Sequence, residues 1–315
     1  MTGMIGGRDA QRMRTLATFA SVGVALVLIV AKLAAYLVTA SVSILSSLID
    51  SCVDLMASAV TLYGVMHAQR PADRSHRYGH GKAEPLAALA QAAFVTGSAV
   101  FLSVEAVQRI VTPQPIGESA VGLAVMGLSI ALTTALVLFQ HRVIARTGSM
   151  AIDADSLHYR GDLLANLAVI AAILLTQATG LQLIDSAFAL VIAAVLVRGA
   201  WRIAMGALDV LMDRELPAVD RERIAHIVLA HEATRGMHDL RTRSSGDRVF
   251  VELHLELDSG LTLAEAHDIT DAVEARLRAA FPTAEILIHQ EPEGLDDERL
   301  DHLIRRSKEI RKRGA

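Results

Sequence analysis

The sequence predicts an α-helical membrane protein: six transmembrane helices followed by a small α+β (αββαβ) domain. The first observation is composition, since 52% of the 315 residues are hydrophobic and the mean hydropathy is +0.40, more apolar than a typical soluble domain. The second is asymmetry, because residues 216–315 hold 20 of the 34 acidic residues and 7 of the 12 histidines. The third is a series of six apolar runs, each of about 20 residues or more, enough to cross a bilayer.

The six runs are separated by links of two kinds. The runs are expected at Leu16–Val38, Ile44–Met66, Leu86–Val111, Ala120–Ile144, Leu157–Gln177 and Ala187–Leu211. The links after the first, third and fifth runs contain no Lys or Arg, whereas the opposite ends of the runs carry many. The positive-inside rule then places both termini in the cytoplasm. We expect an N-terminal segment at 1–14, a membrane domain at 15–213, a cytoplasmic domain at 214–292 and a charged tail at 293–315.

The pattern changes after Pro217, where the apolar residues take the spacing of amphipathic helices and short strands. A domain of the order helix–strand–strand–helix–strand is expected, with both helices on one face of a short sheet. Its elements are predicted at Val219–His231, Met237–Arg243, Arg248–Leu257, Thr262–Ala280 and Glu285–His289. The single cysteine, Cys52, excludes an intrachain disulfide.

Two pairs of ionisable residues interrupt the apolar runs. Asp50 and Asp54 lie in the second run, and His158 and Asp162 lie in the fifth; each pair has i, i+4 spacing and shares one helix face. Carboxylates are costly inside a bilayer and usually mark a functional site. Facing each other, the pairs would form a four-ligand N/O site for a divalent metal. The alternative is a set of hydrogen bonds between helices that holds the bundle together.

Two further clusters carry ligand-type side chains. The loop after the second run contains Asp73, His76 and His80, and the glycines at 79 and 81 allow a sharp turn that could close these three on one ion. Ordinary polar loop residues are the alternative. The C-terminal domain has a second group, in which strand histidines can converge at one sheet edge: His238, His254 and His289, with His267 and Glu291 nearby.

These motifs, in six spans followed by a soluble domain, resemble the cation diffusion facilitator family, most closely its bacterial zinc and ferrous-iron exporters. The resemblance covers nearly the whole chain and is carried by Ser47–Asp54, Pro71–Ala90, Leu157–Asp162, His238–Arg243 and Ile288–Pro292. It implies a homodimer in the bacterial inner membrane with a metallochaperone-like C-terminal domain. It also implies a transport site at Asp50, Asp54, His158 and Asp162, and a salt bridge between Lys82 and Asp213. One departure is Glu291, where close relatives have Asp.

The expected function is export of divalent cations by exchange for protons, because metal binding requires ionised carboxylates and a neutral imidazole. Zn(II) is the first candidate by the Irving–Williams order, and Fe(II), Mn(II), Co(II) and Cd(II) also suit one His and three Asp. The expected partners are metal ions, the lipid bilayer and a second copy of the chain, but no nucleic acid. A non-transporting membrane metal sensor is the alternative. An intramembrane metallohydrolase, and enzyme activity in general, is not expected, because four protein ligands would leave no open position on the metal.

Overall fold

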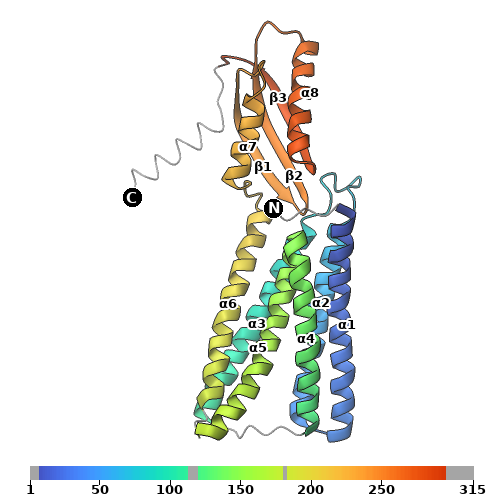
Figure 1. Ribbon diagram of the computed structural model, residues 1–315, viewed down its shortest axis with the longest axis vertical. Helices are drawn as coiled ribbons and strands as arrows, with labels where there is room; N and C mark the ends of the chain where they lie inside the picture. Colours follow the sequence, from blue (N-terminus) through green and yellow to red (C-terminus); the bar gives the residue numbers. More distant parts are fainter. Residues whose placement is uncertain (1–6, 113–119, 180–182, 296–315) are drawn as a thin grey trace, which may run out of the picture. The chain divides into compact units, whose positions relative to one another are not determined.

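The computed structural model describes residues 7–112, 120–179 and 183–295 (Figure 1). The chain divides into two compact units, Met1–Leu211 and Met212–Ala315, and each is described by itself. Residues 113–119 of the predicted link Thr112–Ser119 lie outside the described residues, as does the predicted tail beyond residue 295.

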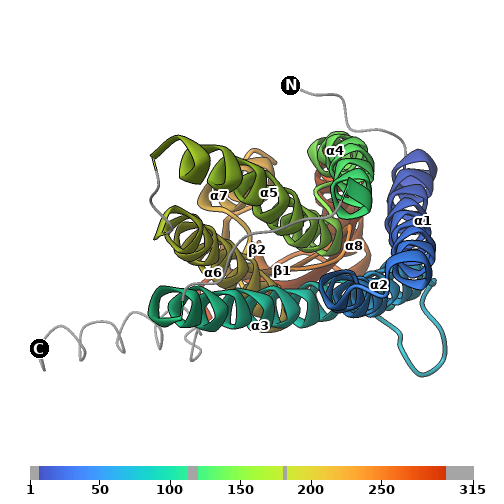
Figure 2. The same ribbon diagram turned by 90° about the horizontal axis from the view of Figure 1, so that it is seen from below.

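The first unit contains six helices among its described residues, each long and apolar enough to cross a membrane. They are α1 (Gly7–Thr39), α2 (Val42–Ala68), α3 (Ala83–Val111), α4 (Ala120–Thr147), α5 (Met150–Thr179) and α6 (Leu183–Leu211). Figure 2 shows them end-on as one bundle. The prediction of six spans is confirmed.

Helix α5 begins at Met150, seven residues before the predicted span. Its first turns contain Asp153 and Asp155, which lower the local hydropathy and so hid this part of the helix from the sequence pattern. Ile152, Ala154 and Asp155 are nevertheless buried. The polar start of α5 therefore belongs to the interior of the bundle.

Small residues allow the helices to pack closely, as expected for membrane helices. Alanines of α3, including Ala88, Ala92 and Ala99, form one buried cluster with α6 residues such as Ala193 and Ala200. Gly64 of α2 lies close to α3. A Cβ atom at that position would lie 2.3 Å from the Cβ of Ala87, so a larger residue requires the helices to separate.

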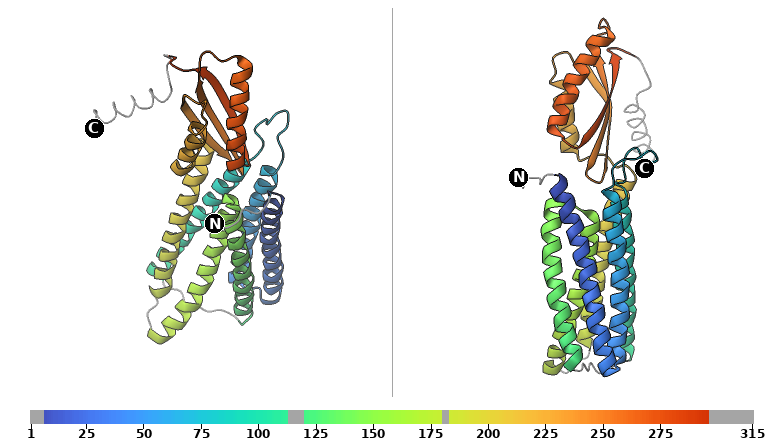
Figure 3. Two further views of the ribbon diagram at one scale, coloured as in Figure 1. Left: turned by 45° about the horizontal axis from the view of Figure 1, so that its top comes forward. Right: turned by 90° about the vertical axis from the view of Figure 1, so that its right-hand side faces the viewer.

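The second unit has the predicted order of elements. It comprises α7 (Ala218–Leu229), β1 (Gly236–Ser245), β2 (Arg248–Leu257), α8 (Leu263–Ala280) and β3 (Ala284–Pro292). The sheet order is β1-β2-β3, with β1 antiparallel and β3 parallel to the central strand β2. Helices α7 and α8 lie on one face of the sheet (Figure 3). The predicted α+β fold is confirmed.

The two faces of β2 differ because side chains alternate along a strand. Val251, Leu253, Leu255 and Leu257 are buried in one cluster with residues of α7 and α8. The intervening residues, among them His254 and Glu256, point to the other face. The hydrophobic pattern of β2 thus leaves a row of polar side chains on the face away from the helices.

Candidate metal centres

Three of the four predicted intramembrane ligands converge between α2 and α5. Ligand atoms of Asp54, His158 and Asp162 all lie within 4.8 Å of one another. The Nε2 atom of His158 is 2.8 Å from Oδ1 of Asp54 and 3.7 Å from Oδ2 of Asp162. The His158 side chain is only 4% exposed, so it is held inside the bundle. One imidazole and two carboxylates within this distance are a donor set that suits a divalent first-row metal.

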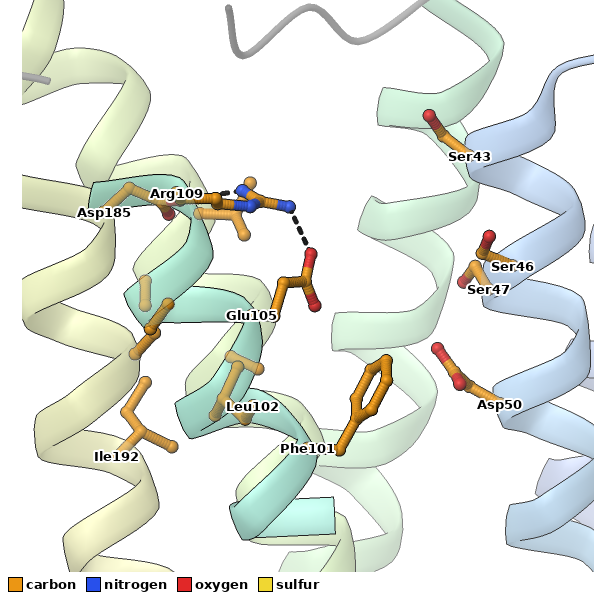
Figure 4. A pocket seen from close by; sticks show the side chains of 15 residues that line it. Ser43, Ser46, Ser47, Asp50, Phe101, Leu102, Glu105, Arg109, Asp185 and Ile192 are labelled. Atoms are coloured by element: carbon orange, nitrogen blue, oxygen red, sulfur yellow. Dashed lines mark hydrogen bonds and ion pairs between the residues drawn. The ribbon is translucent and has the colours of Figure 1, made fainter. Parts of the chain in front are cut away.

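Asp50, the fourth predicted ligand, lies one helical turn from Asp54 but is not in this compact group. It lines a cavity of about 520 Å³ bounded by α2, α3, α5 and α6. Figure 4 shows Asp50 on one wall and Glu105 of α3 on the other. Arg109 also lines this cavity and bonds both Glu105, at 2.7 Å, and Asp185, at 2.8 Å. The cavity therefore connects Asp50 with the end of the bundle where α2 and α6 begin.

A fully buried carboxylate lies on the other side of the site. Asp155 precedes His158 by almost one turn of α5 and is 1% exposed. Its oxygens accept hydrogen bonds from Ser21 Oγ at 2.6 Å, Gln140 Nε2 at 2.8 Å and, more weakly, from Ser58 Oγ and Gln91 Nε2. These donors belong to α1, α4, α2 and α3, so this Asp155 network joins five helices.

The sequence interpretation did not single out Asp155 or Lys32. Lys32 lies within α1 and donates to the Ser47 carbonyl at 3.0 Å and to Ser51 Oγ at 2.7 Å. Both residues carried a signal, because each is an ionisable side chain within an apolar helix. Neither has a ligand-type partner at i, i+4, and their contacts come from other helices.

The second cluster lies in the loop between α2 and α3. Ligand atoms of Asp73, His76 and His80 lie within 4.8 Å of one another. Asp73 Oδ1 accepts hydrogen bonds from the backbone N–H groups of His76 and Ser75, which lower the pKa of the Asp73 carboxyl and keep it ionised. Gly79 adopts a φ of +82°, as the sharp turn requires.

The third cluster lies on the face of the sheet that the helices leave uncovered. His238 pairs with His254 across β1 and β2, and His254 pairs with His289 across β2 and β3. The three histidines therefore form one row, with ring centres 5.0 and 4.8 Å apart. Glu291 follows two residues after His289 and lies on the same face.

Glu291 reaches all three histidines, although close relatives have the shorter Asp at this position. Its carboxylate oxygens lie 2.7 Å from His254 Nδ1, 3.2 Å from His238 Nε2 and 3.4 Å from His289 Nε2. The 3.2 Å contact does not have the geometry of a hydrogen bond, and His238 Nε2 and Glu291 Oε2 are both buried without a hydrogen-bond partner among the described residues. A buried nitrogen and a buried carboxylate oxygen that lie beside each other without hydrogen-bond partners can both act as metal ligands, so they fit a site for a metal ion.

Two of the predicted residues lie apart from these groups. His267 is on α8, where its Nε2 atom is 3.6 Å from Asp271 and its side chain is exposed. Lys82 donates to the Leu211 carbonyl within the first unit, and Asp213 lies 3.7 Å from Arg243 within the second. The predicted pair between Lys82 and Asp213 would join the two units and stays a prediction.

Comparisons with known proteins cover almost the whole chain. Residues 18–212 match the family model for the cation efflux transmembrane domain, and residues 216–293 match that for the cation efflux protein, cytoplasmic domain. The cation-efflux pump FieF of Shewanella oneidensis is 47% identical over 277 residues, which are 88% of this chain and 93% of that protein. FieF of Pectobacterium atrosepticum is 46% identical over 281 residues, 89% and 93% of the two chains. A solved structure of CzrB in its zinc form is 37% identical and covers 28% of this chain and 99% of its own, with a TM-score of 0.26.

The family match and the three clusters of metal-ligand side chains indicate the same class of protein. Members of this family and the FieF relatives are cation efflux transporters, so the prediction that the chain is not an enzyme is confirmed. Six membrane-capable helices and bacterial relatives also support a multi-pass protein of the inner membrane. The chain belongs to the cation efflux (cation diffusion facilitator) family, whose members export divalent metal cations.

Proposed function

We propose that this transporter exports Zn(II) from the cytoplasm in exchange for protons, with Asp50, Asp54, His158 and Asp162 as its transport site. The observation that carries the proposal is the 2.8 Å contact between His158 Nε2 and Asp54 Oδ1. A contact of this length holds one proton between the imidazole nitrogen and the carboxylate oxygen, and it lies on Nε2 when the carboxylate is ionised. Zinc needs the lone pair of that same nitrogen, and the metal and the proton therefore exclude each other.

Coupling follows from this competition. An ion that enters from the cytoplasm displaces the His158 proton and binds the two nearby carboxylates. An ion that leaves on the other side frees the same atoms for protons, which return to the cytoplasm with the empty site. The membrane potential contributes about 2.3 kcal/mol per charge per 100 mV to that inward step.

Two features support alternating access to the site. The cavity that Asp50 lines extends toward the first residues of α2 and α6. On the other side of His158, the buried Asp155 network holds five helices together. We infer that these helices separate when the site opens to the cytoplasm, and that both termini lie on that side.

The ligand set supports zinc as the first substrate. One imidazole with carboxylates also accepts Fe(II), Mn(II), Co(II) and Cd(II), but zinc precedes iron and manganese in affinity at equal supply. We infer further that the C-terminal domain pairs two copies of the chain, and that a metal at the row of histidines regulates or stabilises the homodimer. His267 and the Lys82–Asp213 pair remain part of this proposal.

The test is metal flux in proteoliposomes loaded with a zinc dye and a pH dye, under an imposed pH gradient. We expect zinc uptake coupled to opposite proton movement, and loss of both in Asp162→Asn. Asp258→Asn is the matched control, because Asp258 lies in a loop of the second unit and pairs only with Arg235 and the Gly260 N–H in the described contacts. Zinc flux without proton flux would remove antiport, and no flux for any divalent metal would favour a sensor.

A further inference from the structure

We propose that His67 is a fourth metal ligand of the loop cluster formed by Asp73, His76 and His80. The inference rests on the proposed metal site in this loop but not on transport. His67 lies in the last turn of α2. The sequence pattern predicts no role for it, because a polar residue at the end of an apolar run is ordinary. Its surroundings are what distinguish it.

The rings of three histidines are adjacent at this end of α2. The His80 ring lies between the other two, with its centre 4.8 Å from that of His67 and 4.5 Å from that of His76. Two imidazoles on one tetrahedral zinc have ring centres about 5 Å apart, since each Zn–N bond is about 2.0–2.1 Å long. The spacing on both sides of His80 is thus close to that of rings sharing one ion.

The nitrogen atoms support the same conclusion. Nδ1 of His67 and Nδ1 of His80 are both buried, and neither has a hydrogen-bond partner among the described residues. His80 faces the cluster with its other nitrogen, since its Nε2 lies 3.3 Å from Asp73 Oδ2. The Nδ1 atom of His67 is therefore the one that bears on the proposal. Buried polar atoms without partners are rare and call for an explanation such as an ion.

A fourth ligand also fits the needs of the metal. Structural zinc sites are almost always four-coordinate, and Asp73, His76 and His80 fill only three positions. His67 is not among the three residues whose ligand atoms lie within 4.8 Å, so its side chain must change rotamer when an ion binds. The result is one carboxylate with three imidazoles, which favours zinc over manganese more than the intramembrane site does.

The experiment uses the full-length protein in detergent. Asp162→Asn and His254→Ala each remove one ligand, the first from the intramembrane group and the second from the C-terminal row of histidines, so that only the loop cluster stays intact. Zinc affinity is measured by chelator competition, and the coordination by the visible spectrum of bound Co(II), which is far stronger in tetrahedral sites. His67→Phe keeps a ring beside Tyr63 and His80 while removing both nitrogens, and His67→Gln is the second variant should Phe fail to fold. His226→Phe in α7 is the matched control.

We expect His67→Phe to weaken zinc binding at least about tenfold, the lower end of what even an outer-shell change costs. The intense Co(II) spectrum should weaken as well, while the melting temperature of metal-free His67→Phe should equal that of the parent. The His226→Phe variant should keep the zinc affinity and the Co(II) spectrum of the parent. Full affinity and an unchanged spectrum in His67→Phe, while Asp73→Asn loses binding, would leave a loop site without His67 and overturn the proposal. Binding that survives Asp73→Asn would overturn the loop site itself. Neither result depends on transport.

Discussion

His158 of α5 and Asp54 of α2 share a hydrogen bond of 2.8 Å, although 104 residues separate them in the chain. The bond joins the two helices that supply the proposed transport ligands, and it occupies the atom that a metal requires. A change at either residue therefore affects both the packing of α2 against α5 and the binding of an ion.

The Asp54→Asn variant separates these two effects. Asn keeps an oxygen that accepts from His158 but loses the negative charge that compensates a divalent ion. We expect a folded protein of nearly unchanged melting temperature whose zinc uptake falls to background. Uptake assays in vesicles, with thermal unfolding as the check on folding, measure this. Normal uptake at saturating zinc would contradict the assignment of Asp54.

Selectivity should follow ligand hardness. His158→Asp makes an all-oxygen site, which suits manganese better than zinc, whereas Asp50→His adds an imidazole and favours zinc over iron and manganese. Competition uptake with zinc and manganese together tests both changes. If both variants keep the metal ranking of the parent, selectivity is set outside these four residues.

The Asp155 network predicts a difference between two substitutions. Asp155→Leu removes the acceptor for one amide hydrogen of Gln140 and one of Gln91, at a cost of about 1–3 kcal/mol for each buried group left unsatisfied. Ser21 still donates to the Ala17 carbonyl and accepts from Gln140. Asp155→Asn retains oxygen and shape, and we expect it to unfold closer to the parent temperature. Thermal unfolding in detergent measures the order, and equal stability of the two variants would contradict the role of these hydrogen bonds.

Glu291 should control metal binding in the C-terminal domain. Glu291→Gln removes the charge that contacts three histidines, so zinc affinity of this cluster should fall by about tenfold or more. We also expect a weaker dimer in the presence of zinc. Glu293→Gln is the matched control, because Glu293 contacts only Arg235, at 3.8 Å, in the described ion pairs. Calorimetry gives the affinity, and analytical ultracentrifugation with and without chelator gives the dimer strength.

Acid should loosen the start of α8. The backbone N–H and hydroxyl of Thr262 both donate to Glu265, and these bonds hold the pKa of the Glu265 carboxyl below its ordinary value of 4.5. Because the folded pKa is the lower one, this stabilisation is complete above the unfolded pKa and disappears as pH falls through the folded pKa. Amides in the first turn of α8 should therefore become better protected from exchange as the pH rises from about 3 to about 6. This gain should be larger than in the rest of α8, and it should be absent in a Glu265→Gln variant.

The sequence predicted well whatever depends on periodicity and composition. The six spans and the αββαβ order follow from long apolar runs and from alternation such as that of Val251–Leu257. The i, i+4 spacing also predicted Asp54, His158 and Asp162 as ligands, because residues one turn apart share a helix face however the helices pack.

Relationships between elements could not be predicted in this way. Asp155 has four donors on four other helices, so its environment depends on how those helices pack. The row of His238, His254 and His289 depends on strand register. The hydrophobic pattern predicts the strands but does not say which residue lies opposite which. The position of His67 beside His80 depends on the path of the loop that follows α2.

Asp50 stands apart from the Asp54–His158–Asp162 group and faces the cavity, and this separation bears on the speed of turnover. An ion that left all its ligands in one step would have to regain its whole hydration shell at once. In the proposed transport cycle Asp50 lies nearer the exit, so the ion would exchange one protein bond for one water at a time. Its release rate would then be set by the largest single barrier rather than by the cost of losing all its ligands together. A site that binds strongly can in this way still release quickly.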